Sequence, residues 1–408
     1  MLKVNGDRLW QSLMAMAQIG PGEAGGSSRP ALSAEDKQGR ELFAGWCREL
    51  GMTLHVDAIG NLFARREGRR EGPPLVMGSH LDTQPRGGRF DGVYGVLAGL
   101  EVVRCLHEHN ILTNKPLELA VWTNEEGARF TPAMLGSAVF TGALPLRDGL
   151  AGRDRDGISV AEALAATGYA GELPLQREFD SYFEAHIEQG PVLENDGLPI
   201  GVVTGGQAIC WLDVRVQGQR AHAGTTPMPM RRDALFGTGQ MLAALEQLAT
   251  DFQGLVTVGE LSVAHSSRNT IAGDLQFTLD LRHVEDAVLA AMEEEATRRL
   301  QDIAAERDLR FSLERHWLSP ATPFDPACVK AVRNAVEGLG YAHRDIVSGA
   351  GHDAIHLARH CPTAMVFIPC AGGLSHNEAE SITPEHARQG ADVLLNAVIA
   401  HANTESHV

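Results

Sequence analysis

Two adjacent carboxylates, Glu125 and Glu126 in the segment VWTNEEGARF, stand directly after an apolar stretch of the chain. Neighbouring carboxylates repel each other unless a positive charge lies between or beside them. The pair is consistent with one glutamate that binds a cation and a second that carries out acid–base chemistry. Taken alone, the same two residues are equally consistent with a solvated strand end.

A metal ion would need further ligands, and four other motifs supply imidazole and carboxylate groups. These motifs are GSHLDT with His80 and Asp82, GGRFDGVYG with Asp91, FEAHIEQG with His186, and GGLSHNEAE with His376. Imidazole and carboxylate ligands without a thiolate favour zinc or a similar divalent ion. A lone histidine is more often structural or exposed than a ligand, and this chain has 17 of them. Five motifs in one chain, most of them at strand ends, are nevertheless difficult to explain as chance.

The apolar pattern predicts strands that present these motifs at one edge of a sheet. Residues 75–83 and 117–127 are expected to form strands, and residues 92–109 a buried helix between them. A strand, a helix and a strand in this order form a right-handed crossover in a largely parallel sheet. Functional groups of such sheets gather beyond the carboxyl ends of the strands, where the first histidine motif and the glutamate pair lie.

A different pattern begins near residue 210 and predicts a second domain inserted into the first. Strands are expected at 211–218, 255–265, 275–283 and 309–318, and helices at 231–249 and 285–306. This β-α-β-β-α-β order is typical of a ferredoxin-like α+β unit. The expected division is a catalytic α/β domain, with a mostly parallel central sheet flanked by helices, from 1–209 and 321–408. The inserted domain would cover 210–320, with hinges near 207–210 and 318–324.

Composition excludes several classes of protein. The net charge is −17, from 35 Lys+Arg and 52 Asp+Glu, and a field of this sign repels the phosphate backbone of a nucleic acid. The six cysteines contain no C-x-x-C pair, so neither a disulfide framework nor a thiolate zinc site is predicted. No apolar run approaches the roughly 18 residues of a membrane span, and the N-terminus lacks the uninterrupted apolar stretch of a signal peptide. We therefore expect a soluble, cytoplasmic protein.

Six motifs together resemble the zinc-dependent amidases of the hydantoinase/carbamoylase family. They are GSHLDT, GGRFDG, TNEEGARF, HIEQGPVLE, GQRAHAGTTPM and AGGLSHNEAES. The resemblance extends over nearly the whole chain. This family holds N-carbamoyl-L-amino acid hydrolases, ureidopropionases and allantoate amidohydrolases, and it belongs to a wider clan of two-metal aminoacylases and carboxypeptidases. The resemblance implies that the inserted domain is a lid, which also forms a homodimer.

The resemblance also implies a site for two divalent ions, zinc or alternatively manganese or cobalt. Asp91 would bridge the two ions. His80 and His186 would complete the protein ligands of one ion, and the pair Glu126 and His376 would complete those of the other. Peptidases of the clan usually have a carboxylate at the position of His186, so the histidine favours the amidase branch.

In this family resemblance, Glu125 would be the general base that takes a proton from the water shared by the two ions. Asp82 would lie behind His80 and fix its tautomer. Adjacent strand residues point in opposite directions, so a bend at Gly127 or a strained peptide must turn both glutamates inward. In this clan the strained bond is often cis, and we expect a cis peptide at the Glu125–Glu126 pair.

Four further residues resemble substrate contacts of the family. His222 would reach the active site of the other subunit and polarise the scissile carbonyl; without the family resemblance it would be interpreted as a turn histidine. Arg282 would pair with the substrate carboxylate through its planar guanidinium, the alternative being an ordinary surface arginine. Gln189 and Asn269 resemble polar substrate contacts.

These expectations combine into one activity, the hydrolysis of the linear C–N bond of an N-carbamoyl-L-amino acid to amino acid, ammonia and carbon dioxide. The alternatives are an allantoate amidohydrolase or ureidopropionase, and after them a hydrolase of N-acyl amino acids or dipeptides. A binding protein that has kept the fold without the chemistry is a rival from another class, which an intact Glu125 and a full ligand set disfavour.

Overall fold

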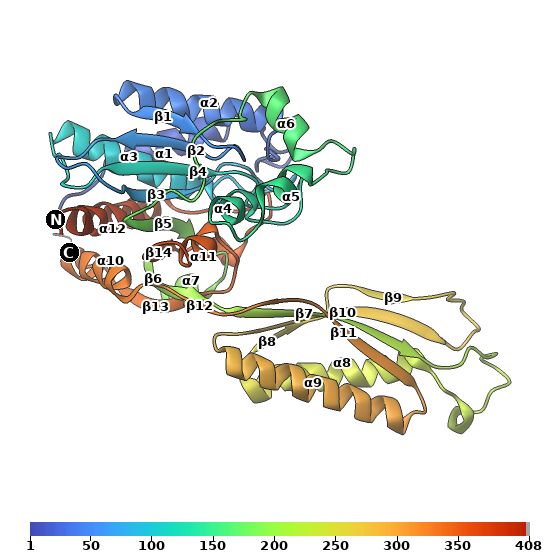
Figure 1. Ribbon diagram of the computed structural model, residues 1–408. Helices are drawn as coiled ribbons and strands as arrows, with labels where there is room; N and C mark the ends of the chain where they lie inside the picture. The colour runs from blue at the N-terminus through green and yellow to red at the C-terminus, as the bar shows by residue number, and fades with distance from the viewer. Residues whose placement is uncertain (405–408) are drawn as a thin grey trace. The chain divides into compact units, whose positions relative to one another are not determined.

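The computed structural model describes residues 1–404, which form two compact units (Figure 1). The first unit combines Met1–Gly205 with the chain from Pro323 onward, and the second is Gly206–Thr322. Each unit has a hydrophobic core of its own. The catalytic and lid roles assigned to 1–209, 321–408 and 210–320 remain predictions. Among the described residues, no helix is long and apolar enough to cross a membrane.

Within residues 1–404, a nine-stranded sheet forms the centre of the first unit, in the order β1-β2-β4-β3-β5-β14-β6-β12 with β13 paired to β6. The strands are β1 (Thr53–Val56), β2 (Leu62–Arg66), β3 (Leu75–His80), β4 (Leu117–Trp122), β5 (Ser181–Ile187), β6 (Ile200–Gly206), β12 (Thr322–Pro323), β13 (His343–Ser348) and β14 (Thr363–Ile368). The strands β4, β3, β5 and β14 are parallel, and antiparallel strands extend the sheet on both sides. The expected α/β fold is therefore confirmed.

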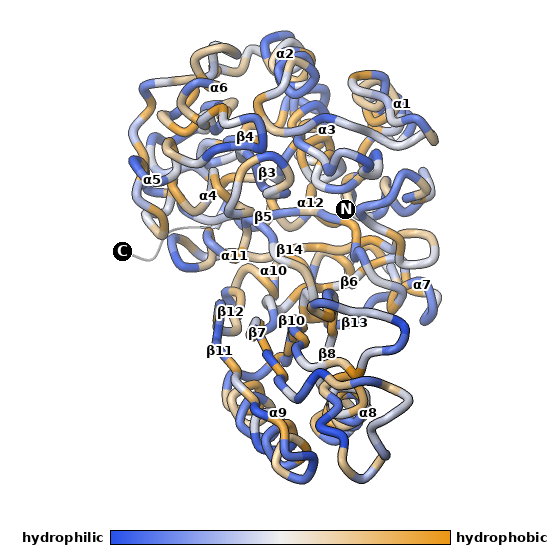
Figure 2. Tube along the Cα trace, turned by 90° about the vertical axis from the view of Figure 1, so that its right-hand side faces the viewer, coloured by the Kyte–Doolittle hydropathy of each residue, from blue (hydrophilic) through white to orange (hydrophobic). Residues whose placement is uncertain are grey.

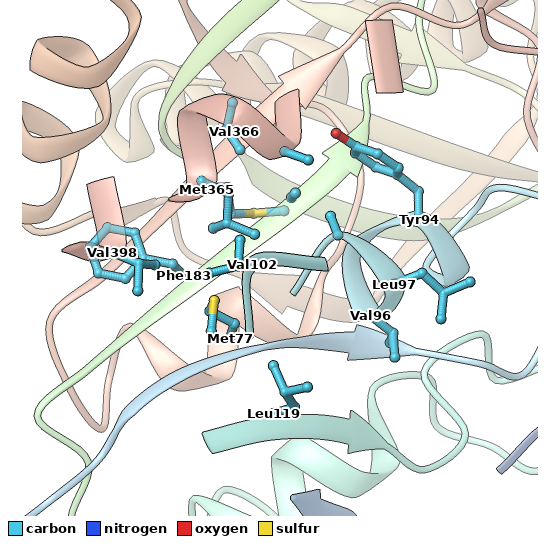
Figure 3. Close-up of a cluster of buried hydrophobic side chains, with 14 of the residues drawn as sticks. Met77, Tyr94, Val96, Leu97, Val102, Leu119, Phe183, Met365, Val366 and Val398 are labelled. Carbon is cyan, nitrogen blue, oxygen red and sulfur yellow. The ribbon is translucent and has the colours of Figure 1, made fainter. Parts of the chain in front are cut away.

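Helices cover the faces of this sheet, and their contacts explain why the four parallel strands are buried and largely apolar. The helices of the unit are α1 (Gly6–Met16), α2 (Ala34–Glu49), α3 (Val93–Glu108), α4 (Leu135–Phe140), α5 (Leu146–Ala151), α6 (Val160–Thr167), α7 (Val192–Asp196), α10 (Pro326–Leu339), α11 (Asp353–Leu357) and α12 (Pro384–Ala402). Figure 3 shows Val102 of α3 and Val398 of α12 close to Met77 of β3 and Phe183 of β5. Every residue of β3, β4, β5 and β14 is buried, as expected for strands covered on both faces.

The strand order creates a switch point at the centre of the sheet. The chain passes from β3 through α3 to β4 on one side of β3, and later enters β5 on the other side of β3. Loops that leave the carboxyl ends of two such strands diverge, and ligands of open α/β sheets bind in the resulting crevice. His80 is the last residue of β3 and His186 is the penultimate residue of β5, so both lie at this edge.

The second unit is an antiparallel sheet with two helices on one face. Within Gly206–Thr322 the strand order is β11-β7-β10-β8, with β9 also paired to β10. Its elements are β7 (Ala208–Gln217), α8 (Ala234–Phe252), β8 (Leu255–Thr257), β9 (Leu261–Val263), β10 (Asp274–His283), α9 (Asp286–Glu306) and β11 (Arg310–Ser319). Both α8 and α9 carry hydrophobic and hydrophilic residues in Figure 2, because only one side of each helix packs on the sheet.

The element order in this unit is β-α-β-β-α-β, but the second strand is divided. The prediction of one strand over 255–265 was wrong, since β8 ends at Thr257 and β9 begins at Leu261. Thr257 pairs with Asp280 and Leu261 pairs with Phe277, so three residues oppose two on β10. The additional residue breaks the ladder, as a β-bulge does.

Candidate metal centre

Asp91 is shared by two groups of possible metal ligands. Among residues 1–404, His80, Asp91 and His186 form one group and Asp91, Glu126 and His376 another, and the ligand atoms within each group lie within 4.8 Å of one another. Oδ1 of Asp91 is 3.3 Å from Nε2 of His186 and 3.7 Å from Nε2 of His80. Oδ2 of Asp91 is 3.6 Å from Nε2 of His376. One carboxylate therefore presents one oxygen to each group, as a ligand that bridges two ions does.

Backbone carbonyls fix the tautomers of the two buried histidines. Nδ1 of His80 is 2.8 Å from the carbonyl oxygen of Asp82, and Nδ1 of His186 is 2.9 Å from that of Ile187. Each Nδ1–H donates to its carbonyl, so Nε2 is the nitrogen of each ring that faces Asp91. Asp82 thus accepts the hydrogen bond of His80 through its backbone carbonyl.

The carboxylate of Asp82 instead holds the glutamate pair. Its two oxygens accept the backbone N–H groups of Glu125 and Glu126, each at 3.3 Å. The carboxylate is fully buried, and burial together with nearby charges raises the pKa of Asp82 to about 6. One side chain at the end of β3 therefore positions two side chains beyond the end of β4.

The expected cis peptide at Glu125–Glu126 is absent. Among residues 1–404, the cis peptide bond is Thr131–Pro132. The chain turns instead at Asn124 and Gly127, which have φ values of 55° and 63°. Asparagine and glycine adopt this left-handed conformation most readily. The bend at Gly127 is thus the correct one of the two alternatives, and both carboxylates reach the site through ordinary trans peptides.

Gly92 allows the closest approach of the Asp91 turn to the histidines. Its φ is 68°, and a Cβ atom added there would lie 2.3 Å from the ring of His80. Its backbone N–H donates to Nε2 of His186 at 3.1 Å. A side chain at this position would displace one ligand of the first group, so the turn requires glycine.

Glu125 lies beside the ligand groups without belonging to either of those found among the described residues. Its Oε2 is 3.4 Å from Nε2 of His80, and its side chain is 11% exposed. Burial raises the pKa of Glu125 well above its ordinary value, and the negative charge of Asp353 adds to the shift. Positive ions at the neighbouring groups would favour the carboxylate form, which is the form a general base needs.

The other candidate ligands lie beside groups of opposite charge, which shift their pKa values. The hydrogen bond that His376 donates to Glu126 raises the pKa of His376 to about 9. Burial would lower the pKa of His186, but the hydrogen bond and charge of Asp91 raise it to about 9. Burial opposes the ionised form of Asp91, yet its bond to His186 lowers the pKa of the carboxyl below its usual range. Imidazole and carboxylate donors without a thiolate suit zinc, manganese or cobalt.

A third cluster of Glu184, His186 and His352 lies deeper in the same unit. The oxygens of Glu184 already accept from the hydroxyls of Ser79 at 2.7 Å and Tyr182 at 3.0 Å. We interpret this cluster as a buried hydrogen-bond network that supports His186. Sequence reasoning missed Glu184, although the period of two in β5 places it on the same face as His186.

Gln189 lies at the metal centre. Its Nε2 donates to Oδ2 of Asp91 at 2.8 Å and lies 3.2 Å from the hydroxyl of Ser375. The residue was predicted as a substrate contact, and in this structure its amide contacts the shared ligand.

The other three predicted substrate residues belong to the second unit. Arg282 is paired with Asp280 on its own strand, with an NH2–Oδ2 distance of 2.7 Å. His222 is exposed, and its Nδ1 accepts the N–H of Gly224 at 3.1 Å. The backbone carbonyl of Asn269 accepts from the N–H of Ala223 at 3.0 Å, so Asn269 lies next to the His222 segment.

His222 and Arg282 lie at opposite ends of the second unit. The chain just before His222 is hydrogen-bonded to the chain just before β10, since the N–H of Gly218 donates to the carbonyl of Gly273. Arg282 lies eight positions after Asp274 along the extended strand, and this spacing corresponds to a distance of about 26 Å. Within one copy of this unit, the two side chains are too far apart to contact the same small molecule.

Comparisons with known proteins agree with this geometry. A family model described as Peptidase family M20/M25/M40 matches residues 76–400. An N-carbamoyl-L-amino-acid amidohydrolase of Rhizobium meliloti is 45% identical over 404 residues, which cover 98% of this chain and 97% of the relative. A crystal structure of a hydantoinase/carbamoylase family amidase from Burkholderia ambifaria is 56% identical, has a TM-score of 0.96 and is matched over 100% of both chains.

A more distant relative is an allantoate deiminase of Arabidopsis thaliana, which is 33% identical over 379 residues, covering 84% of this chain and 72% of the relative. The matches to the amidases thus cover almost the whole chain at higher identity. From these matches, the chain belongs to the peptidase family M20/M25/M40 and, within it, to the hydantoinase/carbamoylase amidases.

Proposed function

We propose that this protein is a two-metal amidohydrolase that cleaves the ureido C–N bond of an N-carbamoyl-L-amino acid. The products would be the amino acid, ammonia and carbon dioxide. The observation that carries the proposal is Asp91, which presents one oxygen to each of two ligand groups beside the unligated Glu125. The relative from Rhizobium meliloti is named for the same activity.

The described side chains could hold two ions. His80 and His186 would bind one ion together with Asp91, and Glu126 and His376 would bind the other together with the same aspartate. Bound divalent ions of this kind lower the pKa of a water molecule and polarise a carbonyl. Zinc is the first expectation, and manganese or cobalt would suit the same donors.

Glu125 would act as the proton carrier of the reaction. Its carboxylate would accept a proton from the attacking water at an Oε atom and return it to the departing nitrogen. The pocket around it favours this role, because a buried carboxyl with a raised pKa holds a proton more readily than a solvated one. Gln189 and Asp82 would keep the neighbouring groups in place through the hydrogen bonds described above.

Substrate recognition would come from the second unit, which would also form a homodimer. Arg282 would bind the substrate carboxylate, and Asn269 and His222 would contact the ureido group at the site of the other subunit. Two observations support a contribution from a second copy. The start of β10, to which the chain before His222 is hydrogen-bonded, lies about 26 Å from Arg282 along the strand. In addition, Met228, Met230 and Phe236 expose 59%, 73% and 54% of their surfaces near the His222 segment.

Ammonia release from a substrate panel tests the proposal. The purified enzyme, reconstituted with Zn²⁺, Mn²⁺ or Co²⁺, would be assayed with several N-carbamoyl-L-amino acids, N-carbamoyl-β-alanine, allantoate, and an N-acyl amino acid or dipeptide. Faster turnover of an N-carbamoyl-L-amino acid than of every other substrate is the expected result. Preference for allantoate or N-carbamoyl-β-alanine would support the allantoate amidohydrolase or ureidopropionase alternative. No turnover with any substrate would support a binding protein and overturn the proposal.

A further inference from the structure

A buried carboxylate, that of Glu380, lies directly behind the shared ligand. Its Oε1 accepts two backbone N–H groups, from Phe90 at 2.8 Å and from Asp91 at 3.0 Å. Its Oε2 is 3.3 Å from the hydroxyl of Ser375. That hydroxyl donates to Oδ2 of Asp91 at 2.6 Å. Glu380 therefore contacts the backbone of Asp91 directly and its side chain through one intermediate group.

The position of this carboxylate is energetically costly. Glu380 is 4% exposed, and burying a charged group next to another carboxylate is unfavourable unless hydrogen bonds or positive charges compensate. Burial and the negative charge of Asp91 raise the pKa of Glu380 to about 7. Gly88 leaves room for the carboxyl group of Glu380, because a Cβ atom at this position would lie only 2.0 Å from it.

The contacts of Glu380 orient both the backbone and the side chain of Asp91. The bonds to Phe90 and Asp91 set the direction of the turn from which the aspartate side chain projects. Ser375 and Gln189 then hold Oδ2, at 2.6 Å and 2.8 Å, on the side of the second ligand group. Oδ1 is left to face the two histidines of the first group.

We propose that Glu380 is a positioning residue for the two-metal centre, and that it sets the rotation of the Asp91 carboxylate so that each oxygen faces a different ligand group. This inference rests on the proposed two-metal function. Glu380 itself would bind neither ion, because both of its oxygens face backbone and hydroxyl donors. Hydrogen-bond partners of metal ligands typically contribute about 10- to 100-fold to metal affinity.

Three variants of the full-length protein test the role. Glu380→Ala removes both acceptors, whereas Glu380→Gln keeps the Oε1 acceptor for the two backbone N–H groups. Glu378→Ala is the matched control: it removes the same charge from the same loop, and its Oε1 accepts from the N–H of Ala24 at 2.9 Å. Zn²⁺ and Mn²⁺ affinity of the metal-free protein would be measured by calorimetry and equilibrium dialysis, with thermal unfolding recorded in parallel.

The expected result is a loss of at least about tenfold in metal affinity for Glu380→Ala, with Glu380→Gln closer to wild type and Glu378→Ala unchanged. A purely structural role would lower the unfolding temperature of Glu380→Ala while its folded fraction bound metal with wild-type affinity, and this outcome would overturn the inference. If Glu380→Ala fails to fold, Ser375→Ala removes the hydroxyl that links Glu380 to Oδ2 of Asp91, and a wild-type metal affinity of that variant would overturn the inference. Wild-type protein that binds no metal would instead refute the two-metal function.

Discussion

At the scale of single residues, the two adjacent glutamates differ in the partners of their carboxylates. Oε2 of Glu126 is 3.1 Å from His376, and both of its oxygens also accept from Gln84. Oε2 of Glu125 is instead 3.4 Å from Nε2 of His80. A bound ion would neutralise the charge of Glu126 in place, which removes the repulsion that two free carboxylates would feel. The pair of adjacent carboxylates is thus explained by two different roles, metal ligand for Glu126 and general base for Glu125.

Replacing Glu125 with glutamine should separate catalysis from metal binding. The amide cannot accept a proton, so we expect kcat to fall by about 10²- to 10⁴-fold, while elemental analysis shows the wild-type metal content. Glu126→Gln is the control, since it should lose metal as well as activity. A Glu125→Gln enzyme with near-normal kcat would contradict the assignment of the base.

Metal binding should release protons at neutral pH. In the metal-free protein, His186 and His376 have pKa values of about 9, so at pH 7 both rings carry a proton that metal must displace. The apparent metal affinity should therefore rise with pH up to about 9 and level off above it, by up to about tenfold per pH unit for each proton released. Calorimetry in buffers of different ionisation enthalpy measures the number of protons. Release of none at pH 7 would show that the rings are neutral before binding.

At the scale of elements, the site depends on turns that follow strand ends. Asp82 after β3 holds the peptides of Glu125 and Glu126 after β4, and Gly92 places the Asp91 turn against the histidines. These contacts join loops that leave neighbouring parallel strands. The switch point between β3 and β5 therefore gives the site its location, and side chain-to-backbone hydrogen bonds give it its geometry.

Gly92→Ala should damage the first ligand group specifically. The added methyl group would lie 2.3 Å from the ring of His80, at a backbone conformation that costs a non-glycine residue about 1–3 kcal/mol. We expect a loss of the ion bound by His80 and His186, measured as metal content per chain. Gly45→Ala in α2 is the control, because nothing lies within 4 Å of the added atom. Equal metal content in the two variants would refute the steric argument.

The sequence was sufficient to predict those parts of the fold that have strong local patterns. The buried runs of β3, β4, β14 and α3 and the order of the second unit are confirmed, because apolar periodicity reports burial directly. The antiparallel strands β1 and β2 were not predicted, since they are short and lie at one side of the sheet. The contact of the Asp82 carboxylate with the glutamate pair and the roles of Glu184 and Glu380 were not predicted, because a side chain that bonds groups distant in sequence leaves no local pattern.

At the scale of the whole molecule, a mixing experiment tests whether two chains build one active site. His222→Ala and Glu125→Gln should each be almost inactive alone. When the two variants are unfolded together and refolded, each mixed dimer would hold one site with an intact Glu125 and the partner's intact His222. About a quarter of the wild-type activity should then return, given random pairing. Activity that stays at the level of the separate variants would contradict a contribution from the second subunit.

Several buried carboxyl groups of the first unit lie close together at the candidate metal centre. Asp82, Asp91, Glu125, Glu184 and Glu380 are all buried near one another. Burial raises the pKa values of Asp82 and Glu125 and neighbouring carboxylates add to both shifts, so the ionised forms would be favoured by added positive charge. Two divalent ions would supply that charge, and so a concentration of acidic groups that is unfavourable by itself becomes a binding site.

The number of metal ions bound per chain tests the account most directly. Metal-free protein would be dialysed against Zn²⁺ or Mn²⁺, and the bound metal would be measured by elemental analysis for the wild type and for Asp91→Asn. We predict about two ions per wild-type chain and loss of tight binding of both ions in the variant, because Asp91 is shared by the two ligand groups. Binding of one ion or none by the wild type, or two ions retained by Asp91→Asn, would contradict the account.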